Sequence, residues 1–214
     1  VSQDAMATLL TAMEDEEDAG FICTGLAGTA KSAFAKAVST TFGVPGITFD
    51  LGAMKNSLVG ESEQAIRSAL RVVKAVSGTG GAFFIASCNQ HESLTPELKR
   101  RFRYGIFYFD IPTEEETCEI WKIQRNRYNI NPNYEQPHII NLTGSDIRNI
   151  CEISYRLSIN LIEASNYIVP VAVADPKQLE HLQDVAHNRW LSASYPGVYH
   201  RKIQTTSGRA FLRQ

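Results

Sequence analysis

The sequence has no long hydrophobic run and no close pair of cysteines. No apolar stretch approaches the roughly 20 residues that a membrane-spanning helix needs, and residues 1–10 have neither the basic start nor the apolar core of a signal peptide. The cysteines form no CxxC pair, which disfavours a zinc site or a redox motif. We therefore expect a cytoplasmic protein with four free thiols, at Cys23, Cys88, Cys118 and Cys151.

The chain also lacks an excess of charge of either sign. The 21 Lys and Arg residues and 23 Asp and Glu residues give a formal net charge of −2, which argues against a protein held mainly by nucleic-acid phosphates. Hydrophobic residues make up 43% of the 214 residues, which excludes a collagen-like or globally disordered chain. A chain of this length can bury one large core, or one core and a small appendage.

Short apolar segments alternate with amphipathic ones in the first half of the sequence. This alternation predicts an α/β fold, with a parallel sheet sandwiched by helices. Strands are expected at 21–24, 47–49, 82–87 and 105–111, and helices at 3–13, 33–42, 62–77 and 96–102. The helix at 33–42 should turn Phe34, Ala37 and Val38 inward. The segment at 105–111 should be the last strand of the sheet.

The pattern changes at Pro112, where helical segments begin to follow one another. Thr113 and Glu116 have the spacing of a capping box, which predicts a helix at 114–126. Further helices are predicted at 145–158, 159–168 and 176–190. The expected units are an α/β domain at 1–112, a small all-helical lid domain at 113–170, and a C-terminal helical extension and tail at 171–214.

A glycine-bearing segment, GLAGTAKS at 25–32, lies between the first predicted strand and its helix. A tight loop at a helix N-terminus gathers backbone N–H groups into an anion site, so this context predicts a phosphate-binding loop. Lys31 would contact the outer phosphates, and the Ser32 hydroxyl would ligate Mg²⁺. The alternative is an ordinary strand-to-helix turn with a surface lysine.

The common phosphate-loop pattern has glycine where this chain has Ala30. If that residue needs a positive φ, alanine costs about 1 kcal/mol; if it is already helical, alanine is harmless. The expected nucleotide-binding residues are Gly25, Gly28, Thr29, Ala30, Lys31, Ser32 and Phe34.

With these residues the chain resembles the AAA+ ATPase family, over roughly residues 20–170. The family's GPPGTGKS is GLAGTAKS here, and its second-strand segment with the following helix is ITFDLGAMKNSLVGESEQAIRSAL. The family's sensor-1 strand is FFIASCN, its arginine segment is LTPELKRRF and its lid is TGSDIRNICEIS. The C-terminal segments NYIVPVA and LSASYPGVY look like those of AAA ATPases from bacteriophages and prophages.

The resemblance implies ATP and Mg²⁺ as cofactors, a ring of identical subunits (expected to be a hexamer), and catalytic roles for Lys31 and three further residues. Asn89 would hold a water against the γ-phosphate, and Arg100 and Arg101 would reach the nucleotide of the neighbouring subunit. Leu58 stands where the family has a pore-loop aromatic residue, with a plain connecting loop as the alternative. Arg148 is either a lid sensor or an ordinary arginine on a helix surface.

One family element is missing from its expected place. The family has a Walker B strand, four apolar residues followed by Asp-Glu, before its sensor-1 strand; here only GTGG at 78–81 lies there. Three explanations stay open: a lost unit with slow or no turnover, a substitute carboxylate such as Asp50 or Glu61, or an omitted segment.

Two functions are therefore expected. The first is an ATPase that assembles into a ring and remodels a protein or protein–nucleic-acid substrate. The second is a non-hydrolysing, nucleotide-binding scaffold or a DNA-associated accessory protein, with 201–213 as a basic arm.

Overall fold

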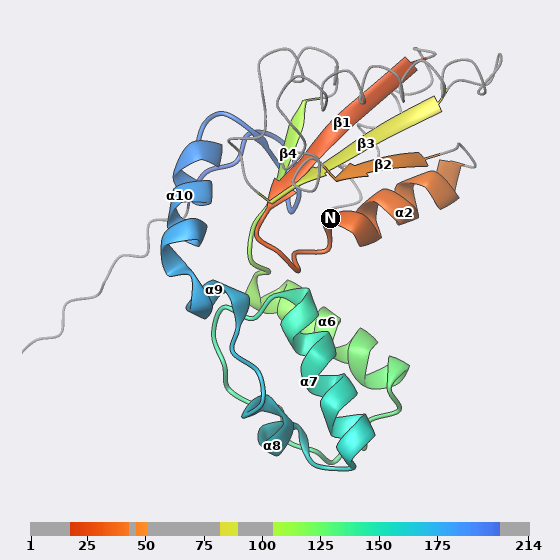
Figure 1. Cartoon of the computed structure of the whole chain (residues 1–214), viewed down its shortest axis with the longest axis vertical. Helices are drawn as coiled ribbons and strands as arrows, with labels where there is room; N and C mark the ends of the chain where they lie inside the picture. Colours follow the sequence, from red (N-terminus) through yellow and green to blue (C-terminus); the bar gives the residue numbers. More distant parts are fainter. Residues whose placement is uncertain (1–17, 43–45, 51–81, 90–104, 202–214) are drawn as a thin grey trace, which may run out of the picture.

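The computed structural model describes residues 18–42, 46–50, 82–89 and 105–201 (Figure 1). Several sequence predictions lie outside these residues. They are the helices at 3–13, 62–77 and 96–102, the pore-loop position Leu58, the acid Glu61, the arginines Arg100 and Arg101, and nearly all of the basic segment at 201–213.

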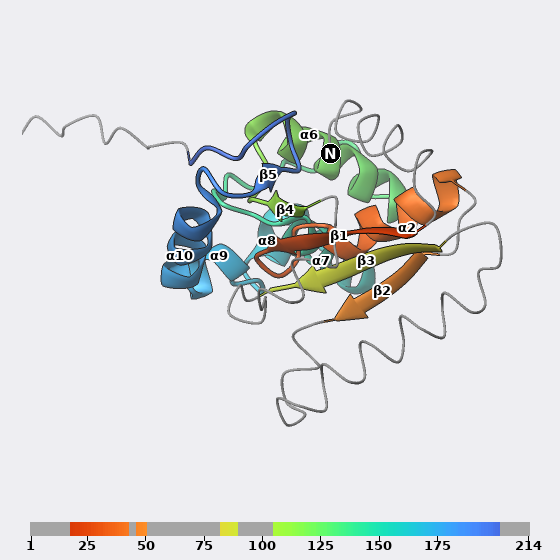
Figure 2. The ribbon, with the colours of Figure 1, turned by 90° about the horizontal axis from the view of Figure 1, so that it is seen from above.

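The described residues form one parallel sheet of five strands, in the order β2-β3-β1-β4-β5. The strands are β1 (Asp18–Gly25), β2 (Gly46–Asp50), β3 (Ala82–Cys88), β4 (Ile106–Phe109) and β5 (Leu191–Ser192). The four predicted strands are confirmed, although β4 is shorter than predicted. β4 is not the last strand, because β5 from the C-terminal part of the chain pairs along its far edge (Figure 2).

The central strand β1 is covered on both faces, which explains its uninterrupted apolar sequence. On one face Phe21 and Cys23 pack against α2 (Lys31–Phe42). On the other face Ile22 packs with residues of α9 (Val171–Ala174) and α10 (Pro176–Ala186). The prediction of a sheet sandwiched by helices is confirmed.

The buried stripe of α2 differs from the prediction by one residue. Phe34 and Val38 are buried as predicted, whereas Ala37 is exposed and Ala35 is buried in its place. The stripe is centred between Phe34 and Ala35, so Ala37 falls beyond its edge.

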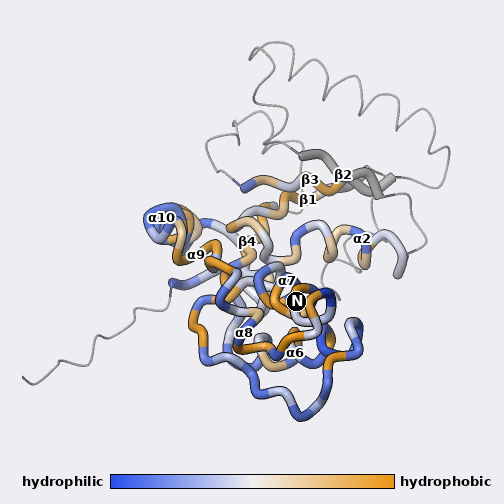
Figure 3. The backbone as a smooth tube through the Cα atoms, turned by 60° about the horizontal axis from the view of Figure 1, so that its bottom comes forward, coloured by the Kyte–Doolittle hydropathy of each residue, from blue (hydrophilic) through white to orange (hydrophobic). Residues whose placement is uncertain are grey.

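Three helices below the sheet in Figure 1, α6 (Glu114–Arg127), α7 (Gly144–Leu157) and α8 (Leu161–Ser165), pack around a core of their own. Trp121, Ile147 and Leu161 lie in that core. The predicted capping box is confirmed: Thr113 Oγ1 accepts from the Glu116 N–H at 3.2 Å, and Glu116 Oε2 accepts from the Thr113 N–H at 2.9 Å. Figure 3 shows hydrophobic and hydrophilic stretches alternating around these helices, as expected for a small helical unit.

The C-terminal part of the described chain returns to the sheet. α10 ends at Ala186, four residues before the predicted end, and the following segment brings Trp190 and Tyr199 into the core. The Tyr199 ring lies 4.6 Å from that of Tyr108 in β4, measured between ring centroids. Residues 171–199 thus complete the second face of the sheet.

All four cysteines are free, with Cys118 exposed and the other three buried, which confirms the prediction of free thiols. None of the helices that the structure describes is both long enough and apolar enough to span a bilayer.

Candidate phosphate-binding site

The predicted phosphate loop connects the carboxyl end of β1 to the first residue of α2. β1 ends at Gly25, and α2 begins at Lys31. The loop therefore lies at the carboxyl edge of a parallel sheet, where ligands of open α/β folds bind. The N-terminus of the 12-residue helix α2 adds the unsatisfied N–H groups and positive dipole end that favour an anion.

Two glycines of the loop hold conformations that L residues rarely adopt. Gly25 has a φ of +144°, and a Cβ there would lie 2.2 Å from the carbonyl oxygen of Phe109. That clash arises because β1 and β4 run side by side up to this pair of residues. Gly28 has a φ of +83°. These positions require glycine for steric reasons, which keeps the loop close to the sheet.

The ammonium of Lys31 lies against the loop. Its Nζ donates to the carbonyl oxygens of Gly25 at 2.9 Å and Leu26 at 2.7 Å, and the lysine is only 7% exposed. Thr29 closes the same turn, since its hydroxyl donates to the Leu26 carbonyl at 2.8 Å. Burial raises the pKa of the Cys23 thiol, and the positive charge of Lys31 opposes that shift. The charge of Lys31 is therefore close enough to affect Cys23, which lies on the face of the sheet that α2 covers.

The backbone at Ala30 decides between the two alternatives left open by the sequence. Ala30 has a φ of +69°, so it occupies the left-handed region rather than a helical one. Its carbonyl accepts the Phe34 N–H at 2.9 Å, which starts the hydrogen bonding of α2. The alanine therefore carries the strain that glycine would avoid.

Ser32 and Phe34 occupy different surroundings in α2. Ser32 is exposed in the first turn of the helix, beside Lys31. Phe34 is buried, with its ring 5.5 Å from that of Phe21 and 5.4 Å from that of Phe109 between centroids. The Phe34 ring thus supports the loop from the core.

Asn89 follows the last residue of β3 and is exposed. In the ladder between β1 and β3, Thr24 pairs with Cys88, so Asn89 stands one residue further along, at the level of Gly25. The polar end of β3 therefore lies beside the start of the loop.

The helical unit touches the loop directly, which the sequence did not predict. The Ser145 N–H donates to the Gly28 carbonyl at 3.2 Å. A Cβ on Gly28 would lie 2.0 Å from Ser145 Oγ and 2.7 Å from Thr143 Oγ1. Thr143 is the N-cap of α7, and its capping box with the buried Asp146 holds this turn in place. In the sequence, the spacing of Thr143 and Asp146 indicates where a helix begins, but it does not indicate that this helix contacts the loop at Gly28.

The structure thus gathers most of the predicted site at one edge of the sheet: Gly25, Gly28, Thr29, Ala30, Lys31, Ser32 and Asn89. Arg148 is exposed on α7, where its guanidinium donates to Asn149 Oδ1 at 3.3 Å.

The donor set of the loop fits Mg²⁺ only as part of a metal–nucleotide complex. Among the residues that the structure describes, no group of three or more His, Cys, Asp or Glu side chains could hold a metal ion. Mg²⁺ at phosphate sites is held by phosphate oxygens, water and one or two protein oxygens. The exposed Ser32 hydroxyl at the start of α2 suits such a site.

Comparisons with known proteins agree with this geometry. The family model "ATPase family associated with various cellular activities (AAA)" matches residues 21–79. A protein of Gracilaria tenuistipitata var. liui, "Uncharacterized AAA domain-containing protein ycf46", is 27% identical over 221 residues, covering 78% of this chain and 45% of the relative. Its namesake in Trieres chinensis is 26% identical over 228 residues, covering 81% of this chain and 45% of the relative.

The chain spans less than half the length of these relatives. The aligned length of 221 residues also exceeds 78% of a 214-residue chain by several tens of residues, so the relative has residues in this region without a counterpart here. Among solved structures, the crystal structure of the FIGL-1 AAA domain superposes with a TM-score of 0.52 at 15% identity, covering 78% of this chain and 76% of that one. This likeness concerns the fold.

Proposed function

We propose that the chain is an AAA-family ATPase domain, on the basis of the family match at residues 21–79 and of the fold, and that it binds ATP with Mg²⁺ and hydrolyses it. We further propose that it assembles into a ring and remodels a protein or protein–nucleic-acid substrate. The observation that carries the proposal is the loop at 25–32, which joins a strand to a helix and is wrapped around the buried ammonium of Lys31.

Each residue of the loop has a role in this proposal. Lys31 exchanges its two carbonyl partners for the outer phosphates of the nucleotide, which are stronger acceptors because they are charged. The glycines at 25 and 28 let the loop pack tightly against β4 and the start of α7, because a Cβ at either position would clash there, and this packing would hold the loop in shape around the phosphates. Asn89, at the level of Gly25, would orient a water near the γ-phosphate.

Mg²⁺, when bound with the nucleotide, would neutralise charge that develops on the phosphate oxygens. The Ser32 hydroxyl would contribute one protein ligand. Arg100 and Arg101, outside the described residues, are proposed to contact the nucleotide of a neighbouring subunit. An arginine supplied in this way is worth about 10³–10⁵ in rate in other nucleotide hydrolases.

Phosphate release from ATP tests the hydrolytic part of the proposal. Wild-type protein should release phosphate, and Lys31→Ala should fall to background because the charge that contacts the outer phosphates is gone. Lys36→Ala is the matched control, since Lys36 is an exposed lysine on the same helix. It should keep the wild-type rate. If wild type and Lys31→Ala both release phosphate only at the background rate, the proposal that the protein hydrolyses ATP is rejected.

The second candidate is a scaffold that binds nucleotide without hydrolysing it, and the pairing of β2 with β3 favours it. β2 and β3 form a direct ladder from Gly46 to Asp50, where the AAA+ resemblance implies an intervening Walker B strand. Background phosphate release together with tight, Lys31-dependent ATP binding would favour the scaffold.

Ring assembly is proposed because arginines from one subunit would complete the site of the next. A hexameric ring, membership of the phage and prophage type of AAA ATPase, and a cytoplasmic location belong to the same proposal. Light scattering should give a higher mass with ATP than without it. An unchanged mass would count against assembly through the nucleotide site.

A further inference from the structure

We propose that Asp50, the last residue of β2, is the carboxylate that holds the nucleotide's Mg²⁺ in this chain. The inference rests on the proposed function, because it presumes that ATP binds at the loop. Asp50 lies on β2, which is separated by β3 from β1, the strand that leads into the loop.

The pairing of the strands places Asp50 in line with the loop. β2 pairs with β3 in parallel, with Asp50 opposite Ser87, and Ser87 in turn is opposite Cys23 of β1. These three residues form one row across the sheet. Neighbouring strands are 4.7–4.9 Å apart, so the row spans about 10 Å from Asp50 to Cys23. The two strands bond directly, so Asp50 is one strand closer to β1 than it would be with a strand inserted.

The row lies on the face of the sheet that α2 covers. Residues of one row share a face, and Cys23 packs in the cluster that contains Phe34 and Val38 of α2. The backbone of α2 also lies close to that of β2. The charge of Lys31 acts on Cys23 from the same face. By backbone register, Asp50 therefore belongs to the row of positions that contains Cys23, on the face of the sheet covered by the helix whose first turn holds Lys31 and Ser32.

The row also lies at the correct level along the strands. Cys23 precedes Gly25, where the loop begins, by two residues, and Asp50 ends its strand at that edge. Mg²⁺ bound to phosphates takes one or two carboxylates, often through water. A carboxylate about two strand spacings from β1 suits that arrangement.

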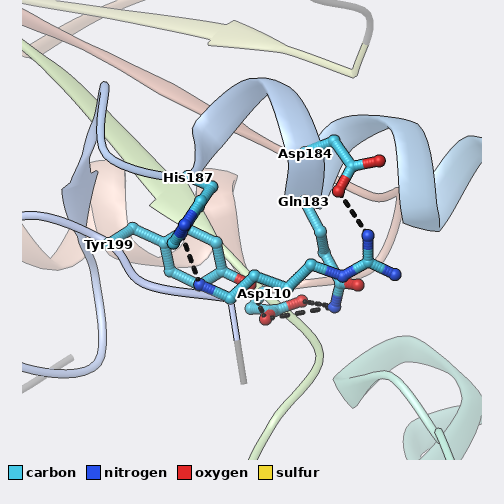
Figure 4. A network of polar contacts seen from close by, with 6 residues as sticks. Asp110, Gln183, Asp184, His187 and Tyr199 are labelled. Atoms are coloured by element: carbon cyan, nitrogen blue, oxygen red, sulfur yellow. Dashed lines mark hydrogen bonds and ion pairs between the residues drawn. The ribbon is translucent and has the colours of Figure 1, made fainter. Parts of the chain in front are cut away.

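Asp110, which follows the carboxyl end of β4, has a structural role. Its carboxylate accepts from the Tyr199 hydroxyl at 2.6 Å and from Gln183 Nε2 at 3.0 Å (Figure 4). It also accepts the Ile111 N–H at 2.9 Å. Asp110 is on the opposite side of β1 from β2. It is therefore a matched control: the same residue type, after a strand of the same sheet, with a structural role.

The test is a fluorescence titration with a labelled ATP analogue, carried out once with Mn²⁺ and once with EDTA. The ratio of the two affinities measures how much the metal strengthens nucleotide binding, independently of hydrolysis. Asp50→Asn should reduce this ratio at least tenfold while the affinity in EDTA stays within twofold of wild type. Asp50→Glu, which keeps the carboxylate, should retain part of the metal effect, and Asp110→Asn should keep the wild-type ratio.

Two results would overturn this inference and leave the proposed function standing. One is an unchanged ratio of the two affinities in Asp50→Asn, and the other is a loss of nucleotide affinity in Asp50→Asn that is equal with Mn²⁺ and with EDTA. The second result would mean that Asp50 serves the fold or the nucleotide rather than the metal. A wild-type protein that binds the analogue under neither condition would overturn the proposed function, and the inference with it.

Discussion

Ala30 combines a left-handed backbone with a side chain that does not favour it. Its φ is +69°, it is exposed, and its carbonyl starts the hydrogen bonding of α2. For an L residue this region costs roughly 1–2 kcal/mol, because the Cβ approaches the following carbonyl oxygen. The surrounding turn, held by Lys31 and Thr29, keeps the residue in that conformation.

Replacing Ala30 with glycine should therefore stabilise the protein. We expect the free energy of unfolding to rise by about 1 kcal/mol, since glycine removes the strain at an exposed position without leaving a cavity. In a chain of this size that corresponds to about 2–4 °C in the melting temperature. Thermal denaturation followed by circular dichroism measures it.

Ala27→Gly is the matched control for that change. Ala27 is exposed in the same loop, and it is not among the described residues that have a positive φ. Glycine there should lower the stability slightly through its greater backbone entropy in the unfolded chain. If Ala30→Gly melts no higher than the wild type, the strain assigned to Ala30 is wrong.

Single residues were predictable where the signal is local. The capping box at Thr113 and the place of Lys31 after a glycine-bearing loop both follow from a few neighbouring residues. The backbone at Ala30 was not predictable, because alanine is compatible with either conformation. The exposure of Ala37 was missed since a short apolar helix offers two almost equivalent inward faces.

At the scale of elements, the start of α7 contacts the loop at Gly28. The Ser145 N–H bonds to the carbonyl of Gly28, and the side chains of Thr143 and Ser145 fill the space where a Cβ would stand. The turn before α7 is held by the Thr143–Asp146 capping box, which limits how far it can yield. The loop at Gly28 and the start of α7 are therefore closely packed against each other.

Gly28→Ala should destabilise the protein by about 3 kcal/mol, combining a strained φ with the clash against α7. Gly197→Ala separates the two causes: Gly197 has a φ of +102°, but a Cβ there meets nothing within 4 Å. The control should lose only about 1 kcal/mol. Urea denaturation measures both, and equal losses in the two variants would show that the contact with α7 contributes nothing.

Elements with strong local patterns were predicted well, and elements that depend on distant partners were not. β1, α2 and α6 carry apolar runs or caps of their own. β5 has only two residues, and its place is set by pairing with β4, more than 80 positions earlier in the sequence. The predicted helix at 176–190 extends beyond the end of α10 at Ala186. Its predicted range includes Trp190, which lies after the helix and packs against Tyr108.

At the scale of the whole molecule, Asp110 links the end of β4 to the C-terminal segment. It receives hydrogen bonds from Gln183 of α10 and from Tyr199, and Figure 4 shows these side chains converging on it. Burial, reinforced by the Asp110 carboxylate, raises the pKa of Tyr199 and of Tyr108 above the usual value of 10.0. Burial also raises the pKa of Cys151 to about 11.

These shifts predict that the protein loses stability in alkali. A group with a raised pKa keeps its proton in the folded state after the unfolded chain has lost it. Its contribution is therefore complete below the unfolded pKa and declines as the pH rises above it. Cys23 and Cys151 start this decline near their ordinary value of 9.0, and the tyrosines add to it above 10.0. Urea denaturation across this range measures the slope.

Tyr199→Phe should make that slope shallower above about pH 10, because one of the titrating hydroxyls is gone. At neutral pH the same variant should be less stable by about 1.5–3 kcal/mol, the usual worth of a hydrogen bond to a charged group. The exposed Tyr155 provides the control, Tyr155→Phe, which should change neither quantity. An unaltered slope in Tyr199→Phe would contradict the role given to its hydroxyl.

Calorimetric titration of the protein with Mg²⁺ and ATP tests most directly whether the loop at 25–32 is a nucleotide site. Wild-type protein and Lys36→Ala should bind with the same affinity, and Lys31→Ala should bind at least tenfold more weakly, since a charged hydrogen bond is worth about 1.5–3 kcal/mol. Absence of binding by the wild type, or equal affinity in Lys31→Ala, would contradict a nucleotide site at this loop.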